Sequence, residues 1–413
     1  MTTRRAAVPF IFVTVVLDVI ALGIIIPVLP HLIEHFLAGD TARAAQWYGG
    51  FVTVAAGMQF VCSPVIGMLS DRFGRRRVIL LSNFGLGLDY IVMALAPTLG
   101  WLFLGRIISG ITGASWTTAG AYIADTTTRE KRAAGYGLLG AAFGLGFVLG
   151  PALGGILGGV NPRLPFWVAG MLTLVNAAWG LFVLPESLPP ERRRPFEWKR
   201  ANPVGSLVLL RSHRELLGLA ASGFVYFVAH NVMPAILVLY AAERYGWGPR
   251  DVGLVLALVG VATMIVQGGL VRRIVPRIGE RRALLAGLAF GTASYAIWGL
   301  APNGRLALAA IPFGAMMGLY TPAAQGIMSR RVGASEQGQL QGANSSVMGI
   351  AGMVAPPLFT QVFARAIDRR GPYLPGAPLL LAAALAAAAM AIAAHATAGQ
   401  RAGGEPLTTP AGS

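Results

Sequence analysis

Charged residues are scarce in this chain of 413 residues, since Asp, Glu, Lys and Arg make up only 12% of it. A soluble globular protein carries about 25% charged residues. The shortage, together with a mean hydropathy of +0.63, excludes an ordinary soluble protein. Several apolar stretches reach 18 residues or more, which is enough to cross a roughly 30 Å hydrocarbon core as a helix. The composition therefore predicts an all-α polytopic membrane protein.

Lysine and cysteine are almost missing. The only lysines, Lys131 and Lys199, are each followed by arginine, and no G-x-x-x-x-G-K-[ST] phosphate-binding loop exists, which excludes an ATP-driven pump. The one cysteine, Cys62, cannot form an intrachain disulfide. The sequence also lacks the H-E-x-x-H and G-x-S-x-G patterns of hydrolases. We therefore expect no enzyme activity, no catalytic residues, no metal site and no cofactor.

Twelve apolar runs are predicted to cross the membrane as helices. The first run carries Asp18 in its middle and is too long for the apolar core of a signal peptide, so it is a mature helix. The approximate ranges of the twelve spans are 8–33, 48–70, 78–96, 100–124, 133–159, 165–184, 215–240, 251–271, 283–301, 304–329, 338–364 and 377–397.

The basic residues are distributed unevenly between the two sides of these spans. If the N-terminus is cytoplasmic, the loops and tails on that side hold 24 of the 33 Lys and Arg residues, the opposite loops hold 8, and Arg106 lies within a span. Cytoplasmic loops carry such an excess in membrane proteins. We therefore expect both termini in the cytoplasm, and the net charge of +16 does not indicate a nucleic-acid partner.

The chain repeats itself at an offset of 205 residues. "DRFGRRR" contains Gly74 and "PRIGERR" contains Gly279, while "LGPALGG" and "APPLFT" place Pro151 and Pro356 at the same offset. Parallel halves of this kind are the architecture of major facilitator transporters, whose binding cavity lies between the halves. The predicted division is a six-helix bundle over 1–184, a cytoplasmic central loop over 185–214, a second six-helix bundle over 215–399 and a cytoplasmic tail over 400–413. The second copy of the "DRFGRRR" loop is degraded, and we expect it to be only structural.

A dense group of charges lies between spans 2 and 3, in "GMLSDRFGRRRVIL". Gly67 lacks a side chain, so another helix can approach it closely. Asp71 can accept the free N–H groups of a helix N-terminus, and Arg75 can pair with a carboxylate, for which Asp125 is the expected partner. These four residues are predicted to form a latch that holds one conformation and releases in another. The alternative is a basic loop that only sets topology.

Ionisable and polar side chains at membrane depth indicate function, because they are costly there. Asp18 and Asp89 lie about ten and eleven residues from the cytoplasmic ends of their spans, or roughly 15 Å deep at 1.5 Å per residue. Gln59 reaches the same depth, and Arg106 lies in the outer half of span 4. We expect a cavity wall whose carboxylates carry protons. The alternative is a buried Asp–Arg pair that only fixes helix packing.

Span 5 contains "GAAFGLGFVLGPALGG". Its glycines Gly146, Gly150, Gly154 and Gly155 provide smooth faces for close helix contact, and Pro151 interrupts the helical hydrogen-bond ladder. The pattern resembles the motif typical of exporters among major facilitator transporters.

Several further stretches resemble the tetracycline-efflux group of drug:proton antiporters. They are "LDVIALGIIIPVLP", "SDRFGRRRVILLSNFGLGLDY", "GRIISGITGA", "IADTTTREKRAAGYGLLGAAFGLGFVLGPALGG" and "PAAQGIMSRRVGASEQGQLQG". In this resemblance the acids of spans 1 and 3 fall on Asp18 and Asp89, the span-2 glutamine on Gln59, the latch on Asp71 and Arg75, the span-4 arginine on Arg106, and a polar residue of span 8 on Gln267.

The resemblance implies a secondary active exporter that exchanges protons for tetracycline-like or other amphipathic drugs by alternating access. It places the chain as a monomer in a bacterial cytoplasmic membrane, with a substrate that can arrive as a divalent-metal chelate. Two positions depart from the group, because its span-8 histidine and span-9 aspartate fall on Thr263 and Gly291. A multidrug or metabolite exporter of the same fold remains an alternative, as does an importer or a non-transporting regulator.

Overall fold

The computed structural model is built from helices, and its described residues contain no strand. The described residues are 2–113, 115–127, 132–193, 195, 202–212, 214–333, 336–368 and 371–398. The predicted tail, 400–413, lies outside them. The predicted all-α fold is confirmed.

The helices of the first half are α1 (Thr2–Ile25), α2 (Leu29–Phe36), α3 (Thr41–Phe73), α4 (Arg75–Leu95), α5 (Leu99–Thr112), α6 (Ser115–Thr126), α7 (Arg132–Val160) and α8 (Leu164–Val183). The helices of the second half are α9 (Val208–Ser212), α10 (Arg214–His230), α11 (Val232–Tyr245), α12 (Pro249–Ile265), α13 (Val271–Ile278), α14 (Glu280–Leu300), α15 (Gly304–Leu308), α16 (Ala310–Met316), α17 (Tyr320–Ser329), α18 (Gln337–Ala366) and α19 (Ala377–Ala396).

Among the described residues, eleven helical segments are long and apolar enough to span a membrane, and Leu99–Thr112 is a shorter apolar helix. Several spans predicted as single helices are interrupted. The first span bends between α1 and α2, where Pro27 and Pro30 supply no backbone N–H. The eighth contains a π-helical turn, Val266–Leu270, with two glycines. Such breaks at membrane depth are typical of transporter helices.

The internal repeat extends to backbone conformation. Gly74 ends α3 and begins α4 with a φ of +100°, and Gly279 separates α13 from α14 with a φ of +79°. Residues with a side chain are rare in this region of φ, so glycine permits the sharp turn. The two turns therefore share one structural solution at matched positions.

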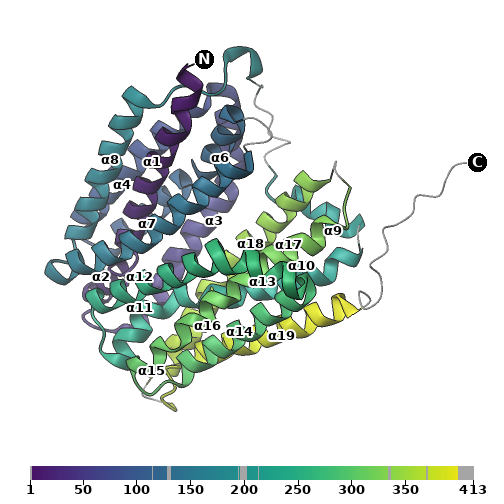
Figure 1. Ribbon diagram of the computed structural model, residues 1–413. Coiled ribbons are helices and arrows are strands. Elements are labelled where there is room, and N and C mark those ends of the chain that lie inside the picture. The colour runs from purple at the N-terminus through teal and green to yellow at the C-terminus, as the bar shows by residue number, and fades with distance from the viewer. Residues whose placement is uncertain are drawn as a thin grey trace, which may run out of the picture.

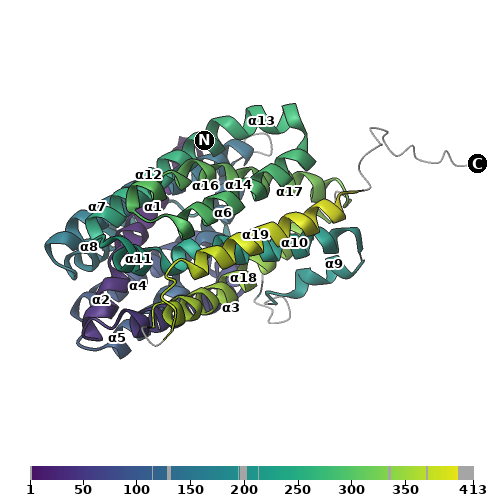
Figure 2. The same cartoon turned by 90° about the horizontal axis from the view of Figure 1, so that it is seen from below.

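The helices gather into two groups, α1–α8 and α10–α19, which diverge toward the end that carries the N-terminus (Figures 1 and 2). The groups meet where α7 packs on α12 and α3 on α18. A Cβ at Gly49 of α3 would collide with the Thr360 side chain of α18. At the same end, Tyr48 Oη donates a hydrogen bond to the Pro234 carbonyl of α11 at 3.2 Å. The halves are thus held together at the end opposite the N-terminus.

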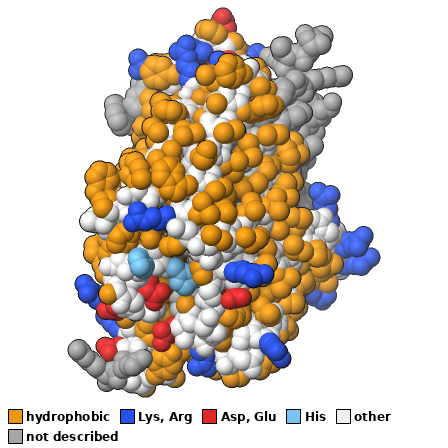
Figure 3. Space-filling view, turned by 90° about the vertical axis from the view of Figure 1, so that its left-hand side faces the viewer, with side chains coloured by type: hydrophobic (Ala, Val, Ile, Leu, Met, Phe, Trp, Pro, Cys, Tyr) orange, Lys and Arg blue, Asp and Glu red, His pale blue; other side chains and the backbone are white. Residues whose placement is uncertain are grey.

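The outer surface is apolar over most of its height. Figure 3 shows hydrophobic side chains covering the middle of one face, with charged side chains toward its top and its lower part. Large side chains such as Phe182 and Leu81 are 85% and 71% exposed. Such a broad apolar surface is expected when lipid, rather than water, surrounds the helices.

Candidate functional site

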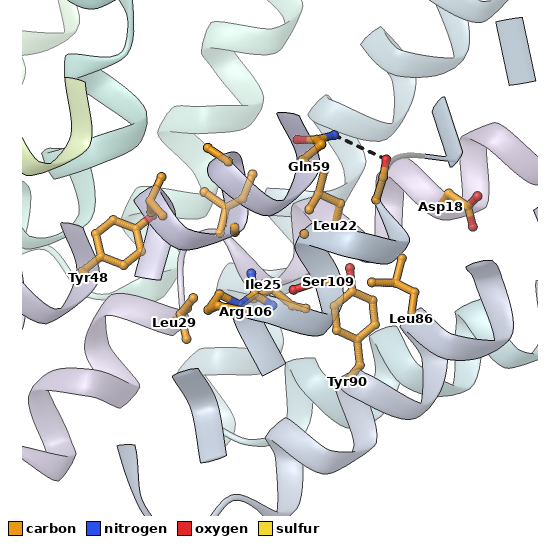
Figure 4. Close-up of a pocket in the computed structure, with 16 residues that line it drawn as sticks. Asp18, Leu22, Ile25, Leu29, Tyr48, Gln59, Leu86, Tyr90, Arg106 and Ser109 are labelled. Atoms are coloured by element: carbon orange, nitrogen blue, oxygen red, sulfur yellow. Dashed lines mark hydrogen bonds between the residues drawn. The ribbon is translucent and has the colours of Figure 1, made fainter. Parts of the chain in front are cut away.

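A cavity of about 280 Å³ lies within the first half, among α1, α2, α3, α4 and α5 (Figure 4). Most of its wall is apolar, and a few polar groups interrupt the wall, as in many small-molecule sites. Its polar side chains are Asp18, Tyr48, Gln59, Tyr90, Arg106 and Ser109. Tyr48 also contacts α11, so the cavity wall reaches the junction between the two halves.

Arg106 and Gln59 are among the predicted residues that line this cavity. Gln59 Nε2 donates a hydrogen bond to the Gly113 carbonyl at 3.3 Å. Arg106 contacts the Met93 sulfur through Nη2 at 3.1 Å, and its buried Nε has no hydrogen-bond partner. A guanidinium held against a thioether keeps most of its capacity to bind an acceptor, so Arg106 is the positive group of the cavity.

Asp18 lies at one end of the site, and Tyr48 lies at the other (Figure 4). The Oδ1 atom of Asp18 accepts a hydrogen bond from Asn176 Nδ2 of α8 at 2.8 Å. Among the described residues, no cation lies within ion-pair distance of the Asp18 carboxylate. Asp18 is therefore held by a neutral amide on one side and borders the cavity on the other.

Asp89 departs from the predicted arrangement, because it does not line the cavity. Its side chain is only 1% exposed, and neither carboxylate oxygen has a hydrogen-bond partner. A Cβ at Gly105 would lie 2.9 Å from Asp89 Oδ1, so glycine at this position makes room for the buried carboxylate. The described residues show no Asp89–Arg106 ion pair of the kind that the packing alternative requires.

The second half was expected to contribute Gln267 to the binding site, but Gln267 does not line this cavity. Gln267 lies in the π-helical turn, and its side chain faces Gly318 of the same half instead of the cavity. At Gly291, where the resemblance implies an acid, a Cβ would lie 2.8 Å from the Met317 sulfur. Met317 is buried and accepts a contact from Tyr295 Oη at 3.4 Å. The methionine thus fills the space that a larger residue at position 291 needs.

The glycines of the predicted exporter motif make close contacts with two other helices. Cβ atoms at Gly146, Gly150 and Gly154 would collide with α1, where the Gly154 position meets the Ile24 carbonyl. A Cβ at Gly155 would lie 2.5 Å from the Pro249 carbonyl and 3.0 Å from a Cα atom of α12. The predicted close packing of α7 is therefore present, and it joins the cavity-lining α1 to the second half.

The partner helices α1 and α12 carry glycines of their own where they approach Pro151 of α7. A Cβ at Gly253 of α12 would lie 2.4 to 3.2 Å from α7, nearest to the Pro151 carbonyl, and a Cβ at Gly23 of α1 would lie 2.9 Å from the Pro151 ring. Proline therefore lies where α1, α7 and α12 meet.

The charges between α3 and α4 form a compact network. Arg75 Nη1 lies 2.5 Å from Asp71 Oδ1, and Arg75 Nε donates to Asp125 Oδ2 of α6 at 3.1 Å, as the sequence predicted for this pair. Ser70 Oγ also accepts from Arg75, at 2.6 Å. Gly67 differs from the prediction, because no atom lies within 4 Å of its would-be Cβ. In this conformation no helix uses the approach that Gly67 permits.

Glu186 was missed in the sequence, and it takes the capping role predicted for Asp71. Its Oε1 accepts from the backbone N–H of Arg75 at 2.9 Å, at the first residue of α4. A carboxylate at this place satisfies a free N–H and complements the helix dipole. Ser187 follows by donating to Asp125 at 3.3 Å. The signal available in the sequence was an acid directly after span 6, but nothing local links it to a helix that begins 111 residues earlier.

A largely apolar cavity with a few polar groups, inside a fold of two membrane-spanning helix bundles, is typical of transporters of small molecules. The family model described as "Major Facilitator Superfamily" matches residues 11–356. The chain therefore belongs to the Major Facilitator Superfamily.

Among curated proteins, the chain is 37% identical over 351 residues to the class C tetracycline resistance protein of Escherichia coli, covering 85% of this chain and 88% of that protein. It is 34% identical to the class B protein of the same organism, covering 85% and 87%. Among solved structures, a bacterial homolog of the human lysosomal transporter Spinster gives a TM-score of 0.76 at 17% identity, covering 96% and 97%. The human organic anion transporter MFSD10 gives 0.69 at 22% identity, covering 94% and 99%.

Proposed function

We propose that this protein exports tetracycline-like or other amphipathic drugs in exchange for protons. The observation that carries the proposal is the cavity of the first half, where the carboxylate of Asp18 lies in a largely apolar wall with Gln59 and Arg106. The similarity to proteins named for tetracycline resistance supports the substrate class. Only a gradient-driven mechanism suits a chain without a nucleotide-binding loop.

The exchange follows from competition at the carboxylate. A tetracycline chelated to a divalent metal ion is a cation with a wide polar edge, which an ionised Asp18 and the Gln59 amide can receive. A proton on Asp18 removes the negative charge and weakens the attraction for the drug cation. Asp89, which is buried, is the second proton-carrying group, and Arg106, a residue of the cavity wall, acts electrostatically on it.

Alternating access requires that contacts at the two ends form in turn. At the end opposite the N-terminus, the junction of Gly49 with Thr360 is closed. At the other end, the open space at Gly67 leaves room for a helix of the second half to dock against the Asp71, Arg75 and Asp125 network. We assign the N-terminal end to the cytoplasm from the excess of basic residues in its loops, and we propose a monomer in the bacterial inner membrane, in which bundles 1–184 and 215–399 rock about the closed junction.

The decisive experiment is proton release from energised everted vesicles on addition of the drug. Wild-type vesicles should release protons on addition of tetracycline with a divalent cation, and vesicles with Asp18→Asn should not. Release in response to a lipophilic cation but not to tetracycline would identify a multidrug exporter. Uptake of a neutral metabolite without any response to cations would contradict export of drugs.

One observation favours the multidrug alternative. The resemblance implies an acid at Gly291, yet Met317 occupies the neighbouring space. Without that acid the second half offers one fewer negative group to a cationic metal chelate, so the chain is less specialised for tetracycline. Competition between tetracycline and a panel of lipophilic cations for the same transport activity will show which of the two substrate classes is transported in preference.

A further inference from the structure

Asn176 of α8 holds the carboxylate of Asp18 from behind. Its side chain is completely buried, and its Nδ2 donates two hydrogen bonds, to Asp18 Oδ1 at 2.8 Å and to the backbone carbonyl of Thr14 at 2.9 Å. Thr14 lies one helical turn before Asp18 on α1. The carbonyl therefore fixes the orientation of the amide, and the second N–H is aimed at the carboxylate.

Burying the Asn176 amide at this position costs folding free energy. Its Oδ1 is buried and has no hydrogen-bond partner, and a buried polar atom without a partner destabilises the folded protein. Asn83 of α4 is a second amide beside the same carboxylate and also acts on it, and Asn176 is the amide with a hydrogen bond of 2.8 Å to it. A leucine at position 176 would give apolar packing between α1 and α8 without this cost, so the presence of an amide points to a role for its bond with Asp18.

We propose that Asn176 is a positioning residue for proton exchange, which stabilises the ionised carboxylate of Asp18 and thereby sets the pH at which the cavity changes from binding a proton to binding a cation. The proposal rests on the proposed function of Asp18 and deepens it. An N–H donor stabilises a carboxylate but not its protonated form, so loss of the donor favours protonation.

The other elements around Asp18 define what else acts on its charge. From α4 and α5, Tyr90, Asp89 and Arg106 interact electrostatically with this part of the bundle. On α8 no residue is titratable, and the described side chains of α7 include none. On α6, Tyr122 and Asp125 are engaged with Pro185 and Arg75 at the far end of the helix. Two neutral amides complete the surroundings of the carboxylate: Asn176, whose Nδ2 donates at 2.8 Å, and Asn83 of α4.

The test measures protonation of Asp18 directly. Infrared spectra of the full-length protein in lipid bilayers, recorded across pH, follow the C=O band of the protonated carboxyl group, and Asp18→Asn assigns the band. Asn176→Leu removes the donor at similar volume, and Asn176→Ser is a second variant with a shorter side chain. Thr173→Val is the matched control, because the buried Thr173 hydroxyl bonds only within its own helix, to the Ala169 carbonyl at 2.8 Å.

In both Asn176 variants the midpoint of the band should move up by about one pH unit, the scale of a lost hydrogen bond to a charged group. The Thr173→Val midpoint should remain at the wild-type value. An unchanged midpoint in a folded Asn176 variant, or a spectrum in which Asp18→Asn removes no titrating band, would overturn the inference. A shifted midpoint in a protein that releases no protons with any drug would instead keep the role of Asn176 and reject the proposed antiport.

Discussion

At an offset of 205 residues, the first half carries Asp18 and Asp89 where the second half carries Gly223 and Ser294. A Cβ at Gly223 would lie 3.5 Å from the Tyr320 hydroxyl, and Ser294 Oγ donates to the Ala310 carbonyl of its own half at 3.0 Å. The second half thus satisfies its polar atoms internally at the matched positions. The first half leaves a buried carboxylate unpaired at Asp89.

The positive charge of the cavity also has no counterpart in the second half. Arg106 matches Ile311, a buried apolar residue. One architecture therefore supports a charged interior and an uncharged one. Since the six-helix fold does not need these charges, the cost of placing them in the membrane points to a function in the first half.

The matched loops of the two halves also differ in how exposed their ion pairs are. Glu280 and Arg330, which match Arg75 and Asp125, form an ion pair with the charges exchanged. The hydrogen bond from Arg330 to Glu280 raises the pKa of the arginine. The Arg330 side chain is 62% exposed, whereas that of Arg75 is 11% exposed. Exposed ion pairs contribute little, so the first pair has the larger expected effect.

The largest test of this asymmetry removes the acids. Asp89→Asn and Asp18→Asn should each lower drug transport against a gradient by about a hundredfold, the scale at which a lost proton-transfer group acts. At least one variant should still exchange labelled for unlabelled drug, which needs no net proton movement. The matched change in the second half, Ser294→Ala, should leave transport near the wild-type rate. Full uphill transport by both Asn variants would make the carboxylates structural.

Adding an acid to the second half tests whether that half can accommodate a buried charge. Gly291→Asp should destabilise the protein by about 1–3 kcal/mol, because it crowds Met317 and buries a carboxylate. A thermal scan in detergent should show an apparent melting temperature several degrees lower. Gly291→Asp combined with Met317→Ala should recover part of the loss. Equal stability of Gly291→Asp and wild type would show that the second half accommodates a charge as readily as the first.

Breaking the ion pair of the first half should slow transport more than breaking that of the second half, but both effects should be smaller than those of removing the acids. If the pair with Asp125 is the predicted latch, Arg75→Ala should slow transport roughly fivefold, or about 1 kcal/mol, with normal membrane insertion. Drug transport in everted vesicles measures the rate, and immunoblotting measures the amount inserted. Charge exchange, Arg75→Glu with Asp125→Arg, should restore part of the activity. Wild-type transport by Arg75→Ala would contradict the latch.

The smallest expected effect belongs to the second pair. Arg330→Ala should change the transport rate by roughly twofold or less, since an exposed pair is worth about 0.5 kcal/mol. The same vesicle assay, with Arg75→Ala measured beside it, gives the ratio of the two effects. A loss for Arg330→Ala as large as for Arg75→Ala would remove the distinction between the halves at this end of the molecule.

Much of the fold follows from local properties of the sequence. Hydropathy predicted the membrane spans, and the offset of 205 residues predicted matched turns, because a helix long enough to cross lipid and a glycine at positive φ are properties of short segments. The breaks within spans were missed. Whether a proline or a pair of glycines bends a helix depends on the neighbours that replace its lost hydrogen bonds.

The candidate site divides in the same way. From the sequence alone came the residue types: acids, a glutamine and an arginine at membrane depth in the first half, and a glycine face on span 5. Only the tertiary structure decided that Asp89 lies behind the cavity instead of in its wall, that Asn176 holds Asp18 across 158 residues of chain, and that Glu186 caps α4. Depth along a helix can be counted from a sequence. The rotation of that helix, and therefore the partner that each side chain meets, is set by packing against helices distant in the chain, since a few tens of degrees exchange one neighbour for another.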